Sequence, residues 1–295
     1  MWRQQMSNDK IVITNVPAIS AIYFALLQCG YEFYSIERSA KHISAIESFY
    51  SPNTSDPFFL QTKQHTCAVY PYWPRAAILE TASFYIDSSK MGFADLEAFQ
   101  QRVMSAGNLS DTERDQLLWS WIVDFPKALE RILHSRHFMQ YKEWEDQWIQ
   151  KQNMAYRDGL LLLQDRLDLC KEVYRSPVKN LQIVLSPIKC IYASDYHMIG
   201  DTFLFSSGAF EPASVTHELL HPVVHPMVQK VKEKILENKR KYRGIDDSYY
   251  LSGHDDGQIN AFEEFLVRSL TKTFEAGIPP TDLDAYTNEI LQSTI

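Results

Sequence analysis

Two histidines four residues apart, with a glutamate directly after the first, are the side chains of this chain best suited to catalysis. Residues 217–221 read His-Glu-Leu-Leu-His. Residues four apart lie one above the other on a helix, so the imidazoles of His217 and His221 can bind one metal ion. Glu218 would lie beside them, where its carboxylate can accept a proton from a water at the metal. The spacing therefore predicts a Zn²⁺ site with its own general base.

A helix must present these three side chains away from the core. Val215, Leu219 and Val223 recur on the face opposite the histidines, which indicates an amphipathic helix. Pro212 suits its first turn. Pro222 directly follows the second histidine, and because it lacks an N–H we expect the helix to kink or end there. The other interpretation is a surface helix that carries two solvated histidines and a glutamate.

A third ligand is expected on a second amphipathic helix, at residues 260–268. Phe262 and Leu266 belong to its apolar stripe, and Glu264 lies on the opposite face. Two such helices could each bury an apolar back and meet with their ligand faces together, so Glu264 is the predicted third ligand. The alternative for Glu264 is a solvated charge paired with Arg268, four residues further on.

Two neighbouring residues offer other possibilities. Glu263 falls inside the apolar stripe, where a carboxylate is costly unless it is bound, so it stays as the alternative third ligand. His225 follows His221 too closely for the H-E-x-x-H-x-x-G-x-x-H pattern of metzincins, and no glycine stands between them. We expect His225 to contact a ligand residue without binding the metal itself, or to lie on the surface.

At these residues the chain resembles a gluzincin, the class of zinc metallopeptidases that includes thermolysin. The match consists of the two histidines, the glutamate between them and Glu264 downstream, and the resemblance covers roughly residues 176–295. The chain departs from the pattern at Arg268, where thermolysin-like enzymes carry an Asp, so the usual partner of the first histidine is unassigned. The linker between the two motifs is also long.

The resemblance implies a small antiparallel sheet ahead of the zinc helix, with an edge strand that pairs with an extended peptide. The residue pattern places strands at Leu181–Leu185, Cys190–Ala193 and Thr202–Ser206, and the last of these is the candidate edge. The predicted fold class is α+β. A mainly helical domain at 1–175, which would select substrate or form a lid, precedes a zincin-like catalytic domain at 176–295, with the sheet, the H-E-x-x-H helix and C-terminal helices.

Helical patterns fill most of the remaining chain. A short strand is expected at Ile11–Thr14 and a loop at Asp246–Gly257. The expected helices are Pro17–Gln28, Ser35–Phe49, Phe93–Met104, one from Asp111 towards Val123, Lys127–Arg175, a basic helix at Met227–Tyr242, and one capped by Thr281 that runs to Gln292.

Composition narrows the class of partner. Hydrophobic residues make up 45% and charged residues 22%, which suits a soluble globular chain with a full core. A net charge of −8 argues against nucleic acid or an anionic membrane as the main partner. The four cysteines form no C-x-x-C, which is typical of reduced thiols in a cytoplasmic protein. The apolar run at 16–27 is too short to span a membrane, and we interpret it as a core helix.

The predicted activity is zinc-dependent hydrolysis of peptide bonds, with a peptide or protein as substrate and Glu218 as general base. The oxyanion formed in such a reaction needs a donor besides the metal, and Tyr249, Tyr250 and His254 are the candidates in the loop before Glu264. One alternative is a non-catalytic regulatory or protein-binding module on a zincin-like scaffold, which would have no need of a general base. Regulated self-cleavage is another. The sequence does not determine peptide specificity, the choice between endopeptidase and exopeptidase, or the oligomeric state.

Overall fold

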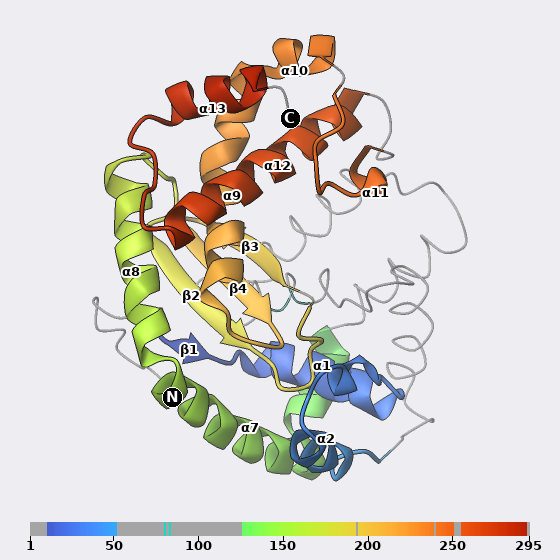
Figure 1. Ribbon diagram of the computed structural model, residues 1–295. Helices are drawn as coiled ribbons and strands as arrows, with labels where there is room; N and C mark the ends of the chain where they lie inside the picture. The colour runs from blue at the N-terminus through green and yellow to red at the C-terminus, as the bar shows by residue number, and fades with distance from the viewer. Residues whose placement is uncertain are drawn as a thin grey trace.

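A mixed β-sheet with helices on both faces forms the centre of the molecule (Figure 1). The computed structural model describes residues 11–51, 80, 83, 126–192, 194–238, 240–250 and 255–293. Within these residues the sheet has four strands in the order β1-β2-β4-β3. The strands are β1 (Ile13–Thr14), β2 (Asn180–Leu185), β3 (Asp195–Ile199) and β4 (Thr202–Ser207). β2 pairs in parallel with β1 and with β4, whereas β3 pairs antiparallel with β4, so the chain has an α+β fold.

The helices account for most of the described residues. They are α1 (Pro17–Gln28), α2 (Ala40–Glu47), α7 (Arg136–Ala155), α8 (Arg157–Glu172), α9 (Pro212–Lys230), α10 (Lys232–Asn238), α11 (Asp247–Tyr250), α12 (Asp255–Glu275) and α13 (Leu283–Gln292). A 3-10 turn occupies Phe33–Ser35, and residues 126–133 are also helical. The prediction of α1 is confirmed at both ends, and the predicted helical region Lys127–Arg175 is confirmed with breaks before α7 and α8.

One face of the sheet packs on α1 and α7. Val184 of β2 and Leu204 of β4 point to this side, where they join Tyr23, Phe138 and Tyr141 in one core cluster. Helix α1 is buried around its whole circumference. Its sequence is almost entirely apolar, as expected for a helix enclosed by other elements.

The opposite face packs on α8, α9 and α12, and α9 lies across this side of the sheet (Figure 1). Ile183 of β2 and Phe203 and Phe205 of β4 supply its apolar side chains, because consecutive strand residues point to opposite faces. Val215 and Leu219 of α9 are fully buried in the same cluster. The predicted apolar face of this helix is therefore confirmed.

Helix α9 continues through Pro222 and Pro226, so the predicted end of the helix at Pro222 is wrong. A proline removes one backbone hydrogen bond and crowds the turn before it. Here Leu219, Leu220 and Val223, on both sides of the first proline, are buried against neighbouring elements. This burial offsets the lost hydrogen bond. The histidine motif consequently lies inside a continuous helix.

The sheet differs from its prediction in three respects. In the predicted strand Cys190–Ala193, Cys190 has no regular structure and residues 191 and 192 form a turn, and the strand begins instead at Asp195. The Cys190 N–H donates to the Tyr31 hydroxyl at 3.2 Å, so the backbone here is held by the N-terminal segment. β4, predicted as the edge, lies between β2 and β3, and β3 is the edge of the described sheet. Finally, the sheet is mixed and not antiparallel, because β4 pairs in parallel with β2.

Two helix starts shift for a local reason. α2 begins at Ala40 and not near Ser35, because the Ser39 side chain accepts a hydrogen bond from the His42 N–H and caps the helix. The last helix is capped by Asp282, one residue after the predicted Thr281.

Other segments also differ in detail. The predicted basic helix Met227–Tyr242 is divided between the end of α9 and α10. The predicted loop Asp246–Gly257 contains α11 and the start of α12. The predicted helices at Phe93–Met104 and from Asp111 onward lie outside the described residues.

The side chain of Asn153 covers the outer edge of β1. Its Oδ1 accepts a hydrogen bond from the Ile13 N–H at 2.8 Å, and its Nδ2 donates to the Ile13 carbonyl at 2.7 Å. One primary amide on α7 thus makes the pair of bonds that a neighbouring strand would make.

The two predicted domains contribute to one sheet. β1 belongs to the first and pairs with β2, which belongs to the second. α8 and α9 likewise pack in one core cluster. The boundary at residue 175 stays a prediction, and these contacts run across it.

Two observations bear on the predictions from composition. None of the described helices is long and apolar enough to cross a membrane. Of the described cysteines, Cys170 and Cys190 are buried free thiols.

Candidate metal centre

Helix α9 places His217 and His221 one turn apart, with their ring centroids separated by 5.2 Å. Both side chains are partly exposed, whereas Val215, Leu219 and Val223 of the same helix are buried on the side that packs in the core with the sheet. Helix α12 packs across α9 (Figure 1) and brings its own side chains to the histidines.

Glu264 of α12 reaches both histidines. Its Oε2 lies 3.6 Å from Nε2 of His217 and 3.8 Å from Nε2 of His221. Ligand atoms of the three residues all lie within 4.8 Å of one another. Tetrahedral Zn²⁺ with bonds of about 2.0–2.1 Å needs donors roughly 3.3–3.4 Å apart. The donor types and their spacing therefore fit such an ion after small side-chain shifts.

Arg268 binds the second oxygen of the same carboxylate. Its Nε donates to Oε1 of Glu264 at 2.6 Å, and its Nη1 donates to the Gly244 carbonyl at 2.5 Å. Burial alone would raise the pKa of Glu264, but hydrogen bonds and charge from His217 and Arg268 lower it to about 2. The pair with Arg268 that the sequence suggested does form. The Glu264 side chain, however, is only 7% exposed, so it is not a solvated surface charge.

Glu263 lies behind the histidines and not between them. Its Oε1 is 3.2 Å from Nδ1 of His221, and its Oε2 is 2.9 Å from Nδ1 of His225. A proton on Nδ1 of His221, held by Glu263, leaves the Nε2 lone pair directed towards Glu264. The side chain of His225 is 59% exposed and contacts the site through Glu263. The structure thus separates the two adjacent carboxylates, one towards Nε2 and the other towards Nδ1.

Glu218 lies beside His217 in a cavity of about 340 Å³ that Tyr192 and Ser194 also line. Burial raises the pKa of Glu218. The nearby histidines oppose this effect, whereas the charges of Asp195 and Glu264 add to it. A carboxylate with a raised pKa is a stronger base at neutral pH than an ordinary one.

A second cavity, of about 400 Å³, lies on the α12 side of the histidines. His221, Glu263 and Glu264 line it together with Tyr249. Burial raises the pKa of the Tyr249 hydroxyl, and the charge of Glu264 adds to the effect. Tyr249 is therefore the predicted oxyanion donor that the structure brings to the cluster.

The other two predicted donors are placed differently. The Tyr250 hydroxyl accepts a hydrogen bond from the Tyr242 N–H at 2.6 Å and so binds the chain segment before α11. Gly257 packs against the Tyr250 carbonyl, where a Cβ would lie only 2.4 Å from the oxygen. His254 lies outside the described residues.

Tyr196 on β3 is a residue of the site that the sequence did not reveal. Its ring stacks on His221, with centroids 5.9 Å apart and planes at 17°, and on Phe203 at 5.0 Å and 14°. Burial and the charges of Glu218 and Glu263 raise the pKa of Tyr196 to about 12. Alternation along Asp195–Ile199 is the signal that could indicate this strand, whereas the sequence pattern favours a strand at Cys190–Ala193.

No protein-family model, no curated protein and no solved structure matches this chain. The resemblance to gluzincins consequently rests on the motif residues themselves and on the arrangement of their side chains.

Proposed function

We propose that this chain is a zinc-dependent metallopeptidase that hydrolyses peptide bonds. The observation that supports it best is the convergence of His217, His221 and Glu264 from two helices, with their ligand atoms within 4.8 Å of one another. Glu218 lies beside this cluster with a raised pKa. The same set of residues, two histidines with a third ligand from a later helix, is what the resemblance to gluzincins implies.

Each residue of the site has a role in the proposal. Zn²⁺ held by the three ligands would keep a fourth position for water, lower the pKa of that water and polarise a substrate carbonyl. Glu218 accepts the proton of the water and can pass it to the leaving amine. Glu263 fixes the ring of His221 through Nδ1. Tyr249 is the candidate donor to the oxyanion.

An extended peptide is the form of substrate that β3 could bind. Among the described strands, β3 pairs with β4 alone. The backbone N–H and C=O groups of an edge strand can accept an added strand. Since Tyr196 of β3 stacks on His221, a peptide bound along this edge would pass close to the histidines. This geometry supports a peptide or unfolded protein segment as the substrate.

One observation favours the non-catalytic alternative. Arg268 and the histidines already bind the Glu264 carboxylate, so the buried charge is compensated without a metal ion. A protein-binding module on this scaffold would need no more than that. Glu218 distinguishes the two proposals, because only the peptidase uses it as a base.

The decisive experiment combines metal analysis with a peptide-cleavage screen. We expect the purified protein to bind about one equivalent of zinc. Glu218→Gln should keep the fold and the metal but lose hydrolysis, because an amide cannot accept the proton. Glu237→Gln, an exposed change on α10, is the matched control. Zinc binding without cleavage of any peptide by the wild type would favour the non-catalytic module. Absence of zinc binding would contradict the peptidase and leave the non-catalytic module, which needs no metal ion.

A further inference from the structure

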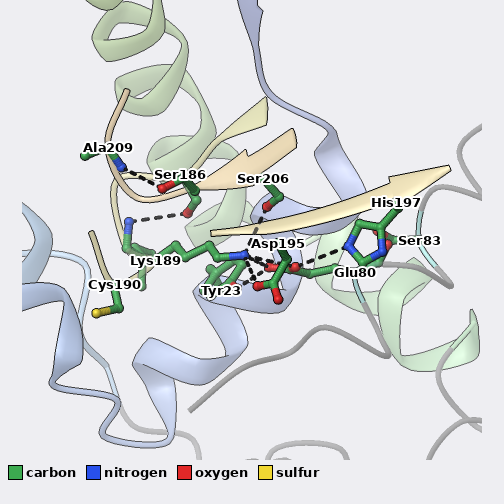
Figure 2. A network of polar contacts seen from close by, with 12 residues as sticks. Tyr23, Glu80, Ser83, Ser186, Lys189, Cys190, Asp195, His197, Ser206 and Ala209 are labelled. Carbon is green, nitrogen blue, oxygen red and sulfur yellow. Dashed lines mark hydrogen bonds and ion pairs between the residues drawn. The ribbon is translucent and has the colours of Figure 1, made fainter. Parts of the chain in front are cut away.

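A buried lysine lies close to β3, on the side of the strand away from the histidines. Lys189, in the connection between β2 and β3, is only 1% exposed. Its Nζ donates to the two carboxylate oxygens of Glu80 at 2.9 and 3.1 Å and to Oδ2 of Asp195 at 2.8 Å (Figure 2). Burial alone would lower the pKa of Lys189, but the charges of Asp195 and Glu80 raise it. The ammonium therefore stays charged inside the protein, held by two carboxylates.

This ammonium bridges the first residue pair between β3 and β4. Asp195 of β3 lies opposite Ser206 of β4. Lys189 Nζ donates to the Ser206 hydroxyl at 3.2 Å as well as to Asp195, so one group binds both members of the pair. Hydrogen bonds from a charged donor are stronger than those between neutral groups. The start of the edge strand is thus fixed to its neighbour by side chains in addition to the backbone.

Lys189, Glu80, Asp195 and Ser206 form a polar network. The alternation of side chains along β3 connects this network to the metal centre. Asp195 and His197 face the network, and His197 Nε2 lies 3.7 Å from Oε2 of Glu80 (Figure 2). Tyr196 lies between Asp195 and His197 in the sequence, so its side chain points to the opposite face of the strand. There it stacks on His221. Whatever fixes Asp195 in position therefore also fixes the ring that covers this histidine.

The network is anchored outside the sheet as well. The Tyr23 hydroxyl on α1 donates to Glu80 (Figure 2). The Arg38 guanidinium donates to the carbonyl of Lys189 at 3.0 Å and to that of Gly208 at 2.7 Å. Gly208 has no room for a side chain, because a Cβ would lie 2.1 Å from the Lys189 carbonyl oxygen. The lysine is consequently held between α1 and the turn that leads into α9.

We propose that Lys189 is a positioning residue for the metal centre, which fixes Asp195 at the start of β3 and thereby holds Tyr196 over His221. The consequence for hydrolysis rests on the proposed function, whereas the effect on β3 does not. Without the ammonium, Glu80 and Asp195 would be buried carboxylates without their cation. The start of β3 would then separate from β4, and the Tyr196 ring would lose its fixed place.

Hydrogen exchange at the β3 amides tests the proposal directly. Lys189→Met replaces the charged side chain by a long apolar one and so removes the charge. We expect the β3 amides to exchange at least ~10-fold faster, while those of α13 keep their wild-type rates. Lys179→Met is the matched control, because this lysine is 72% exposed and lies just before β2. Wild-type exchange rates at β3 in Lys189→Met would overturn the proposal.

A milder variant covers the case in which Lys189→Met does not fold. Asp195→Asn keeps an oxygen that can accept from Lys189 but removes the charge that strengthens the bond. The β3 amides should exchange faster than in the wild type, by less than in Lys189→Met. Unchanged rates in the folded Asp195→Asn protein would count against the proposal with equal force.

Kinetics separate a positioning role from general support of the fold. If the wild type hydrolyses peptides, Lys189→Met should bind zinc with near wild-type affinity but show a raised KM, because the edge strand is loosened. Wild-type KM and kcat alongside faster β3 exchange would overturn the positioning role. If the wild type binds no zinc, the proposed function fails, and the exchange measurement still decides whether Lys189 fixes β3.

Discussion

Arg268 and Glu264, one helical turn apart on α12, form an ion pair in which Nε lies 2.6 Å from Oε1. The other oxygen of the carboxylate, Oε2, faces Nε2 of His217 and His221. The two oxygens of Glu264 therefore have different partners, and only one of them is directed at the candidate metal site. The Arg268 guanidinium therefore partly neutralises the negative charge with which Glu264 would bind a metal ion.

Replacement of Arg268 should separate these two effects. Arg268→Met should lower the stability of the metal-free protein by about 1 kcal/mol, a modest value because the guanidinium is partly exposed. Zinc affinity should be kept or raised, since Glu264 no longer shares its charge. Thermal unfolding with and without zinc measures both, and Arg243→Met, at an exposed position, is the control. A fall in zinc affinity would show instead that Arg268 orients the carboxylate for the metal.

Loss of Glu264 should remove most of the zinc affinity. Glu264→Ala deletes one of three predicted ligands. The loss of zinc affinity should therefore exceed the ~10–100-fold that is usual when a residue that hydrogen-bonds a ligand is replaced. Competition with a chromophoric chelator gives the affinity. Glu275→Ala, an exposed change at the end of the same helix, should leave it unchanged. Retained affinity in Glu264→Ala would exclude this residue as a ligand.

Glu263 should have a smaller effect of a different kind. Glu263→Ala frees the ring of His221 and should weaken zinc binding ~10–100-fold. Glu263→Gln should weaken it less, because the amide oxygen can still accept from Nδ1. The absorption spectrum of the Co²⁺-substituted protein should report the same number of ligands in both variants. A loss equal to that of Glu264→Ala would identify Glu263 as the third ligand.

Acid should destabilise the fold through Glu80. Burial alone would raise the pKa of Glu80, but the Lys189 ammonium and His197 lower it. A carboxyl with a lowered pKa stabilises the folded state above its unfolded value of about 4.3, and this contribution is lost as the pH falls through the folded pKa. Urea unfolding from neutral pH to below about pH 4 should show the loss, and Glu80→Gln should lose less stability over that range. An identical pH dependence in both proteins would contradict this role.

The sequence was sufficient to predict which helix faces carry the candidate site. The predicted apolar stripes of α9 and of α12 are buried, so the orientation of His217, His221 and Glu264 follows from a local period of 3.6 residues. The role of Glu263 was also present as a signal, since a carboxylate within an apolar stripe must be bound to something. Both inferences depend only on neighbours within one or two turns.

The edge strand could not be predicted in the same way. Whether Cys190 belongs to a strand depends on its bond to Tyr31, which is far away in the sequence. The place of Tyr196 over His221 depends on the order of strands in the sheet and on the helix that crosses it. Lys189 is a further case, because its partner Glu80 lies 109 residues away. Such contacts arise only when distant segments meet.

The side-chain amide of Asn153 makes the two edges of the described sheet different. It occupies the hydrogen-bonding groups of Ile13, so a foreign strand that approached β1 would first have to displace a side chain on α7. Among the described strands, β3 forms the other end of the sheet. Self-association by strand addition and the capture of a peptide would consequently compete for the same place. A bound peptide would then keep copies of this chain apart while it occupied that edge.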